Sequence, residues 1–356
     1  MLEIDRFYVT LTERCNMRCP HCWISAGAHA VSYEEISGRE VTRAIDELIP
    51  FGLKAVKLTG GEPLVRKPVA YDIMEHCSQQ GLHISLETNA VLVDKVDIQR
   101  ISSLSSVEFG TSLDFPTAME FDAFRAFPGG FARVTDTIKE MARTGTVTST
   151  MAVFRDNLGL MEAVADLVVD LGASARFLLC MDLGRAEDRM NGRLLSSAEI
   201  ISFYREVNRL AGKYPGRVSA MTPWAMADLS GRLRIGKCDA ERMISLLPDG
   251  SISTCGIAII NTRAVLGNIR THSIADVWRD SPVMCELRNR NQVKYKGVCG
   301  MCMFQDACAN RCPAYAFDVF GSFDGPYPVC QRLYEDGLFP SEFIVRDRGA
   351  VMVENA

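Results

Sequence analysis

Short apolar segments alternate with amphipathic segments along the first 215 residues. Six segments of strand length are rich in apolar and β-branched residues, and a turn signal follows each. They are Arg6–Thr12, Lys54–Thr59, Leu82–Thr88, Val107–Leu113, Val147–Phe154 and Arg176–Met181. Apolar residues recur at helical spacing between them, in Phe131–Arg143, Leu158–Leu171 and Ser197–Ala211. Ser32 and Glu35 form a capping box, which predicts a further helix that ends near Pro50.

Six β/α units in a row predict an α/β fold with a parallel sheet and right-handed crossovers. Such a sheet can be open, doubly wound or a partial barrel. In each case the active site lies at the carboxyl ends of the strands. The residues that follow each strand are therefore the first place to look for chemistry.

The pattern changes after about residue 215. Strand-like pieces become short, helices are few, and the loops contain Cys, Gly and Pro. Residues 298–327 have little apolar mass of their own. We expect metal ligation to hold this region together in place of a hydrophobic core.

Composition limits the possible functions. The 356 residues suit two domains, and 47% hydrophobic with 23% charged residues is typical of a globular protein. A net charge of −5 argues against nucleic-acid binding. We expect no membrane association, because no long apolar run is present. The acidic N-terminus does not resemble a signal peptide, which favours a cytoplasmic location.

Thirteen cysteines are unusual in a reducing compartment and indicate metal or redox chemistry. Three of them, Cys15, Cys19 and Cys22, directly follow the first predicted strand. Three thiolates in one loop can ligate three irons of a 4Fe–4S cluster and leave the fourth iron open. A zinc site is the alternative, but it requires four ligands and only His21 is near.

The Cys-x-x-x-Cys-x-x-Cys loop resembles that of the radical S-adenosylmethionine (SAM) superfamily. Further matches lie at the ends of later strands. Thr59-Gly60-Gly61-Glu62-Pro63 is similar to the family's GGEP turn, where the glycines allow close backbone approach and Glu62 offers a carboxylate to the SAM amino group.

The resemblance implies further SAM contacts. Thr88 and Asn89 correspond to a segment near the ribose, although Ala90 stands where Gly is usual. Ser112 is a candidate donor to the SAM carboxylate. Arg185 lies in a Gly-Arg-Ala element and either faces the active site or has a structural role. His21 occupies the place of an aromatic residue whose backbone meets the adenine.

The later cysteines resemble the SPASM domain, an auxiliary iron–sulfur module. The pattern comprises Cys238, Cys255, Cys299, Cys302, Cys308, Cys312 and Cys330. The resemblance implies a radical SAM core in residues 1–215 with a partial (β/α)6 TIM-like barrel. It also implies a loop-rich SPASM domain in 216–335 and a tail in 336–356.

The family's pattern assigns Cys299, Cys302, Cys308 and Cys330 to an outer auxiliary cluster. Cys312 then joins Cys238 and Cys255 at an inner one. Its fourth iron is vacant, has a non-cysteine ligand or uses Cys285, and we favour the first two. A structural role for both clusters is compatible with electron transfer. Cys77 reads as a buried small hydrophobe, and Cys180 as a possible substrate contact.

The resemblance therefore implies three 4Fe–4S clusters, SAM and a one-electron reductant such as flavodoxin or ferredoxin. Reductive cleavage of SAM yields a 5′-deoxyadenosyl radical that abstracts hydrogen from the substrate. We favour a peptide or protein side chain, modified by crosslinking, oxidation or epimerisation. The alternative is a small metabolite, namely an amino acid, sugar or tetrapyrrole. The first strand begins near the N-terminus, so a peptide substrate predicts a separate recognition protein. No catalytic base can be named.

Overall fold

The computed structural model describes residues 2–28, 31–230, 233, 238–256, 262–292 and 294–345. They form two compact units, residues 1–194 with 242–279 and residues 195–241 with 280–356. This division differs from the predicted boundaries at residues 215 and 335. Residues 346–356 of the predicted tail lie outside the described residues. Within the described part of the chain, no helix is both long and apolar enough to cross a membrane.

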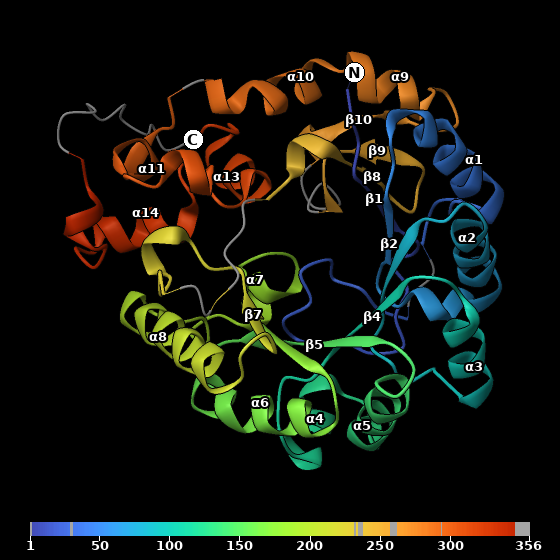
Figure 1. The fold of residues 1–356 in the computed structure, drawn as a ribbon, viewed down its shortest axis with the longest axis horizontal. Coiled ribbons are helices and arrows are strands. Elements are labelled where there is room, and N and C mark those ends of the chain that lie inside the picture. Colours follow the sequence, from blue (N-terminus) through green and yellow to red (C-terminus); the bar gives the residue numbers. More distant parts are fainter. Residues whose placement is uncertain are drawn as a thin grey trace. The chain divides into compact units, whose positions relative to one another are not determined.

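Six parallel strands form the centre of the first unit, as predicted. They are β1 (Arg6–Thr10), β2 (Ala55–Thr59), β3 (His83–Glu87), β4 (Val107–Ser112), β5 (Thr146–Val153) and β6 (Ser174–Leu179). Helices lie on their outer side in Figure 1. They are α1 (Gly38–Leu48), α2 (Lys67–Gln79), α3 (Lys95–Ser103), α4 (Ala118–Arg125), α5 (Gly130–Met141) and α6 (Met161–Asp170). The α/β fold with a parallel sheet is confirmed.

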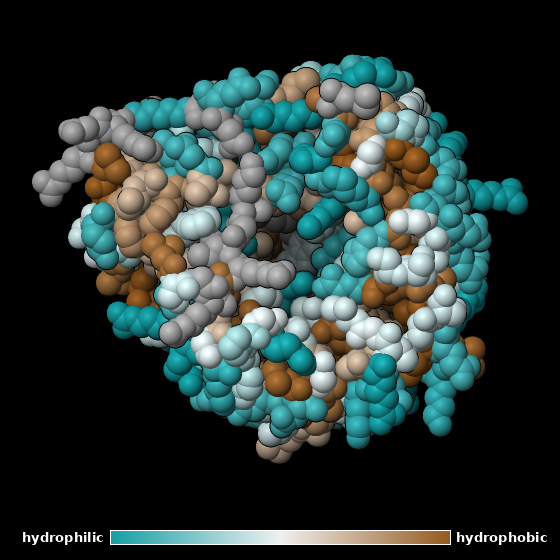
Figure 2. Space-filling view, viewed as in Figure 1, coloured by the Kyte–Doolittle hydropathy of each residue, from teal (hydrophilic) through white to brown (hydrophobic). Residues whose placement is uncertain are grey.

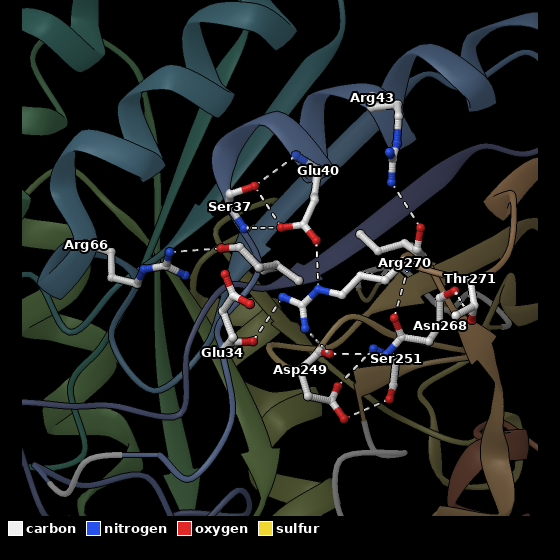
Figure 3. Close-up of polar contacts among 12 residues, drawn as sticks. Glu34, Ser37, Glu40, Arg43, Arg66, Asp249, Ser251, Asn268, Arg270 and Thr271 are labelled. Carbon is white, nitrogen blue, oxygen red and sulfur yellow. Dashed lines mark hydrogen bonds and ion pairs between the residues drawn. The ribbon is translucent and has the colours of Figure 1, made fainter.

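Residues of the predicted second domain extend this sheet. Strand β8 (Met243–Leu246) pairs parallel with β1, and β9 (Ser251–Ser253) and β10 (Val265–Asn268) follow antiparallel. Arg270 joins this segment to α1, as Figure 3 shows. Its guanidinium donates to Glu40 Oε1 at 2.9 Å and to the carbonyl oxygens of Glu34 and Asp249. The β8–β10 segment therefore belongs to the first unit, which also contains α7 (Arg185–Arg189) and most of α9 (Ile274–Asp280).

Side-chain alternation separates the two faces of the sheet. Phe7 and Val9 of β1 and Val56 and Leu58 of β2 are buried in the apolar core. The intervening Tyr8 and Lys57 line a cavity on the other face. Successive side chains of a strand point to opposite faces, so the apolar set packs toward the helices and the polar set faces the interior.

The second unit is more helical than predicted. It contains α8 (Ser197–Lys213), β7 (Val218–Ala220), α10 (Pro282–Asn289), α11 (Gly297–Met301), α12 (Gln305–Cys308), α13 (Pro313–Phe320) and α14 (Pro328–Glu335). The expectation of few helices after residue 215 is therefore wrong. The helices are short, so their periodicity is weak in the sequence.

The predicted capping box is also wrong. The box that opens α1 consists of Ser37 and Glu40, five residues later. Glu35 instead accepts hydrogen bonds from Thr12 Oγ1 and, at 2.6 Å, from Arg14 Nη2. The Glu35 carboxylate, which the sequence pattern assigned to the helix cap, thus makes a tertiary contact with the segment after β1.

Candidate active site

The three N-terminal cysteines lie in the loop after β1 and line one cavity. Cys15 Sγ accepts the Met17 amide at 3.4 Å, and Cys22 Sγ accepts the Ala26 amide at 3.3 Å. Such N–H···S bonds stabilise thiolate ligands and influence the potential of a cluster. Burial raises the pKa of Cys15 to about 12, so a metal must displace the proton.

The glycine turn after β2 is hydrogen-bonded to the segment that leads into this loop. Gly61 N donates to Thr12 O at 2.7 Å, and Glu62 N donates to Arg14 O at 2.9 Å. A Cβ atom on Gly60 would lie 2.6 Å from Thr12 O, and one on Gly61 would overlap Arg14 O. Only glycine permits this approach, and both glycines line the cavity beside the cysteines.

Glu62 lies beneath the turn, fully buried, and does not line the cavity. Its carboxylate accepts hydrogen bonds from Leu64 N, Thr88 Oγ1 and Asn89 N at 2.9, 2.8 and 2.7 Å. Burial raises its pKa to about 7 although these donors lower it. These contacts favour a positioning role over the expected contact with a ligand amino group. Pro63 is buried and opens the 3-10 helix η2 (Pro63–Arg66).

Thr88, Asn89 and Ser112 line the same cavity from the ends of β3 and β4. Asn89 Nδ2 donates to Asn16 Oδ1 at 2.8 Å and lies 3.7 Å from Cys15 Sγ. Ala90 takes a left-handed conformation with φ 66°, which is the conformation that glycine favours. The turn is therefore formed despite the substitution.

His21 lines the cavity between two of the cysteines. Its ring stacks on Phe124 with centroids 5.0 Å apart, and Nδ1 is buried without a hydrogen-bond partner among the described residues. Burial lowers its pKa to about 4, so the ring is neutral at pH 7. An unpaired polar atom in this position is available to a ligand.

Arg185 braces the cysteine loop and does not line the cavity. Its guanidinium donates to the carbonyl oxygens of Cys19 and Ser25, each at 2.8 Å, and of Ala26. Gly184 has φ 61°, and a Cβ there would overlap the carbonyl of Trp23. The structural alternative for Arg185 is therefore favoured over a cofactor contact.

Arg125 is a site residue that sequence reasoning missed. It lines the cavity and pairs with buried Asp114, two residues after Ser112. Asp122, three residues earlier on α4, does not pair with it and accepts the amides of Gly129 and Phe131 instead. Arg125 ends α4, and only the helix position relative to β4 brings it to Asp114.

The cavity has a volume of about 420 Å³. Its charged lining residues are Lys57, Glu87, Arg125 and Arg176, which the sequence reading did not select. Cys180, at the end of β6, and Cys255 also line it. Figure 2 shows a hollow in the viewed face, with hydrophilic residues above it and to its right.

Four cysteines line a second cavity, inside the second unit. They are Cys299, Cys302, Cys308 and Cys330, with apolar neighbours that include Val298, Phe304 and Phe339. Cys299 Sγ accepts the Tyr327 amide at 3.3 Å, and burial raises the pKa of this thiol to about 12. Cys312 is buried at the start of α13 and does not line this cavity.

The remaining cysteines occupy different environments. Cys238 and Cys312 belong to the second unit, and Cys255 belongs to the first. Cys77 is fully buried in α2, as a small hydrophobic residue would be. Cys285 is exposed on α10.

Comparison with known proteins accounts for the two groups of cysteines, one in each unit. Residues 9–168 match the profile of the radical SAM superfamily. Residues 238–303 match that of the SPASM iron–sulfur cluster-binding domain. The chain belongs to the radical SAM superfamily. It is an enzyme of the branch that has a C-terminal SPASM domain.

Relatives within this superfamily differ in what they make. The chain is 28% identical to the mycofactocin maturase MftC of Mycobacterium tuberculosis over 93% of this chain and 84% of that protein. It is 26% identical to an AdoMet-dependent heme synthase of Methanosarcina barkeri over 92% and 95%. The fold is similar to that of Streptococcus suis SuiB bound to the precursor peptide SuiA, with TM-score 0.72, 13% identity and coverage of 93% and 76%.

The donor sets suit the cofactors that a radical SAM enzyme requires, namely iron–sulfur clusters and SAM. Cys15, Cys19 and Cys22 share one cavity with the glycine turn, and four further thiols share another. In the described ranges, no three His, Cys, Asp or Glu side chains gather closely enough to hold a single metal ion.

Proposed function

We propose that this enzyme abstracts hydrogen from a peptide or protein side chain, leading to a crosslink, an oxidation or an epimerisation. One observation supports the radical chemistry above all. The glycine turn is hydrogen-bonded to the segment that precedes Cys15, so both line one cavity. A cluster on the three cysteines and SAM on the turn would then be neighbours.

The chain's residues divide into two groups in this proposal. Cys15, Cys19 and Cys22 hold the cluster, which together with SAM supplies a 5′-deoxyadenosyl radical. Gly60, Gly61, Thr88, Asn89, Ser112 and His21 line the cavity and are available to SAM. Glu62 and Arg185 position the turn and the loop, and Arg125 adds a buried cation beside them.

We further propose two auxiliary clusters. Cys299, Cys302, Cys308 and Cys330 hold the outer one, supported by their common cavity. Cys238, Cys255 and Cys312 hold the inner one, with a vacant iron or a non-cysteine ligand at its fourth position. A one-electron donor such as flavodoxin or ferredoxin reduces the enzyme.

The peptide assignment rests on relatives. One sequence relative is a maturase, and one protein of similar fold was solved with a bound precursor peptide. A separate recognition protein would present the peptide. The similarity to heme synthases, over nearly the whole chain, favours a tetrapyrrole as the second candidate.

Iron analysis and SAM cleavage test this proposal. Anaerobic reconstitution should give about twelve irons per chain, and Ala at Cys15, Cys19 and Cys22 should remove about four. Under reducing conditions the wild type should form 5′-deoxyadenosine and the triple variant none. The variant with Ala at Cys299, Cys302, Cys308 and Cys330 is the control, because it should also lose about four irons, but from an auxiliary cluster. Formation of 5′-deoxyadenosine by the N-terminal triple variant would refute the assignment.

A further inference from the structure

Three charged side chains from different strands meet in the cavity of the first unit. Lys57 on β2, Glu87 on β3 and Arg176 on β6 all line it. Lys57 Nζ lies 2.8 Å from Glu87 Oε1, and Arg176 Nη1 lies 3.8 Å from the same oxygen. A single carboxylate oxygen is thus shared by two cations.

The arrangement is built into the sheet. A Cβ atom on Gly110 would overlap the Glu87 carboxylate, so the glycine leaves room for it. Lys57 Nζ also lies 5.2 Å from the centroid of the Tyr8 ring, a cation–π contact. Burial opposes the charge on Lys57, but Tyr8 and Glu87 outweigh it and raise the pKa. Burial likewise opposes the charge on Glu87, but Lys57 and Arg176 lower its pKa, so the pair is ionised at pH 7.

Arg176 is the loosely held member of this group. Its two ion-pair contacts, 3.8 Å to Glu87 and 3.5 Å to Glu108 Oε1, exceed normal hydrogen-bond length. Among the described residues, no hydrogen bond of its side chain is found. A guanidinium has five N–H donors arranged to match a carboxylate. These donors are therefore available to a ligand in the cavity.

Lys57 and Arg176 lie farther from the carboxyl ends of their strands than the glycine turn does. Lys57 precedes Thr59 by two residues on β2, and Arg176 precedes Leu178 by two on β6, and all four line the cavity. Two residues of a strand span roughly 6–7 Å. A group bound to Arg176 is therefore separated by about this depth from ligands at the strand ends.

We propose that Arg176 and Lys57 bind a carboxylate of the substrate, which competes with Glu87 for the two cations. The proposal rests on the proposed function in taking this cavity as the active site. Before binding, Glu87 and Glu108 balance the two cations. An incoming carboxylate replaces the long Arg176–Glu87 contact with direct hydrogen bonds.

Calorimetric titration of the reconstituted, oxidised full-length enzyme tests the site. SAM is kept saturating, so that its own carboxylate does not compete, and the probes are 3-phenylpropionate and 3-phenylpropionamide. A charge-assisted hydrogen bond predicts that the wild type binds the acid about ten-fold more tightly than the amide. Arg176→Gln should abolish this preference. Glu87→Gln should tighten acid binding and leave amide binding unchanged, a gain that a misfolded variant cannot produce.

Arg143→Gln is the matched control, because it removes the same charge from an exposed position on the first unit. It should keep the wild-type preference. Equal binding of acid and amide by the wild type in both the small-molecule pair and the peptide pair described below, or an unchanged preference in Arg176→Gln, overturns the proposal.

Two further arms identify the source of the carboxylate and separate the two proposals. A short peptide with a free C-terminus, compared with its amidated form, tests a peptide carboxylate against the small acid, and a preference for either acid supports the site. Acid selectivity in an enzyme that forms no 5′-deoxyadenosine supports the carboxylate site and refutes only the proposed function. Formation of 5′-deoxyadenosine without acid selectivity refutes only the carboxylate site.

Discussion

The guanidinium of Arg125 lies against the buried carboxylate of Asp114, with Nε 2.8 Å and Nη2 2.5 Å from Oδ2. Asp114 also accepts the amide of Ala152 at 3.0 Å. The pair therefore joins the end of α4, the loop after β4 and strand β5. Arg125 meanwhile faces the cavity that the cysteine loop lines.

Removing one partner of this pair should destabilise the first unit. Arg125→Ala leaves the Asp114 carboxylate buried and unpaired, which costs about 3–5 kcal/mol in the free energy of unfolding. Chemical denaturation of the cluster-free protein measures this. Arg143→Ala, which removes an exposed ion pair, should cost less than about 1 kcal/mol. Similar losses in the two variants would contradict the buried-pair interpretation.

Glu62 predicts a specific pH dependence. Its pKa is raised by burial to about 7 in the folded state, so folding favours the protonated form. Its contribution to stability is complete below about pH 4.5 and declines as pH rises to about 7. The pKa difference amounts to about 3 kcal/mol. The stability of wild type relative to Glu62→Gln, measured across this range without clusters, should fall with pH. A pH-independent difference would contradict the raised pKa.

Gly184 should resist substitution for two separable reasons. Gly184→Ala introduces a left-handed alanine, which costs about 1 kcal/mol, and a clash with the Trp23 carbonyl. Gly192 has a similar φ of 72° but no atom within 4 Å of an added Cβ. Gly192→Ala therefore measures the conformational cost alone. Gly184→Ala should be less stable than this control and retain less iron, and equal effects would show that the clash is relieved elsewhere.

Iron content should distinguish the cysteines of the second unit. Cys302 shares a cavity with three further thiols, whereas Cys285 is exposed on α10. Cys302→Ala should lose up to about four irons, and Cys285→Ala should lose none. Loss of iron from Cys285→Ala would instead support Cys285 as the fourth ligand of the inner cluster.

The sequence alone predicted the six parallel strands and the superfamily. Both depend on local patterns. Apolar residues alternate within each strand, and the motifs occupy consecutive positions after strand ends, so spacing along the chain suffices. The grouping of Cys299, Cys302, Cys308 and Cys330 was likewise expected from the family's spacing, and they share one cavity.

Only the tertiary structure decided which side chains meet across elements. The sequence predicted a ligand contact for Glu62 and left Arg185 as either an active-site or a structural residue, and their hydrogen bonds to residues distant in the chain favour positioning roles for both. The packing of α4 brings Arg125 against Asp114. The arrangement of the strands in the sheet brings Lys57 and Arg176 to Glu87. The spacing of a motif determines which residues follow a strand. The burial of a side chain and the choice of its partner depend on contacts between segments that are distant in the sequence, and local spacing does not determine these contacts.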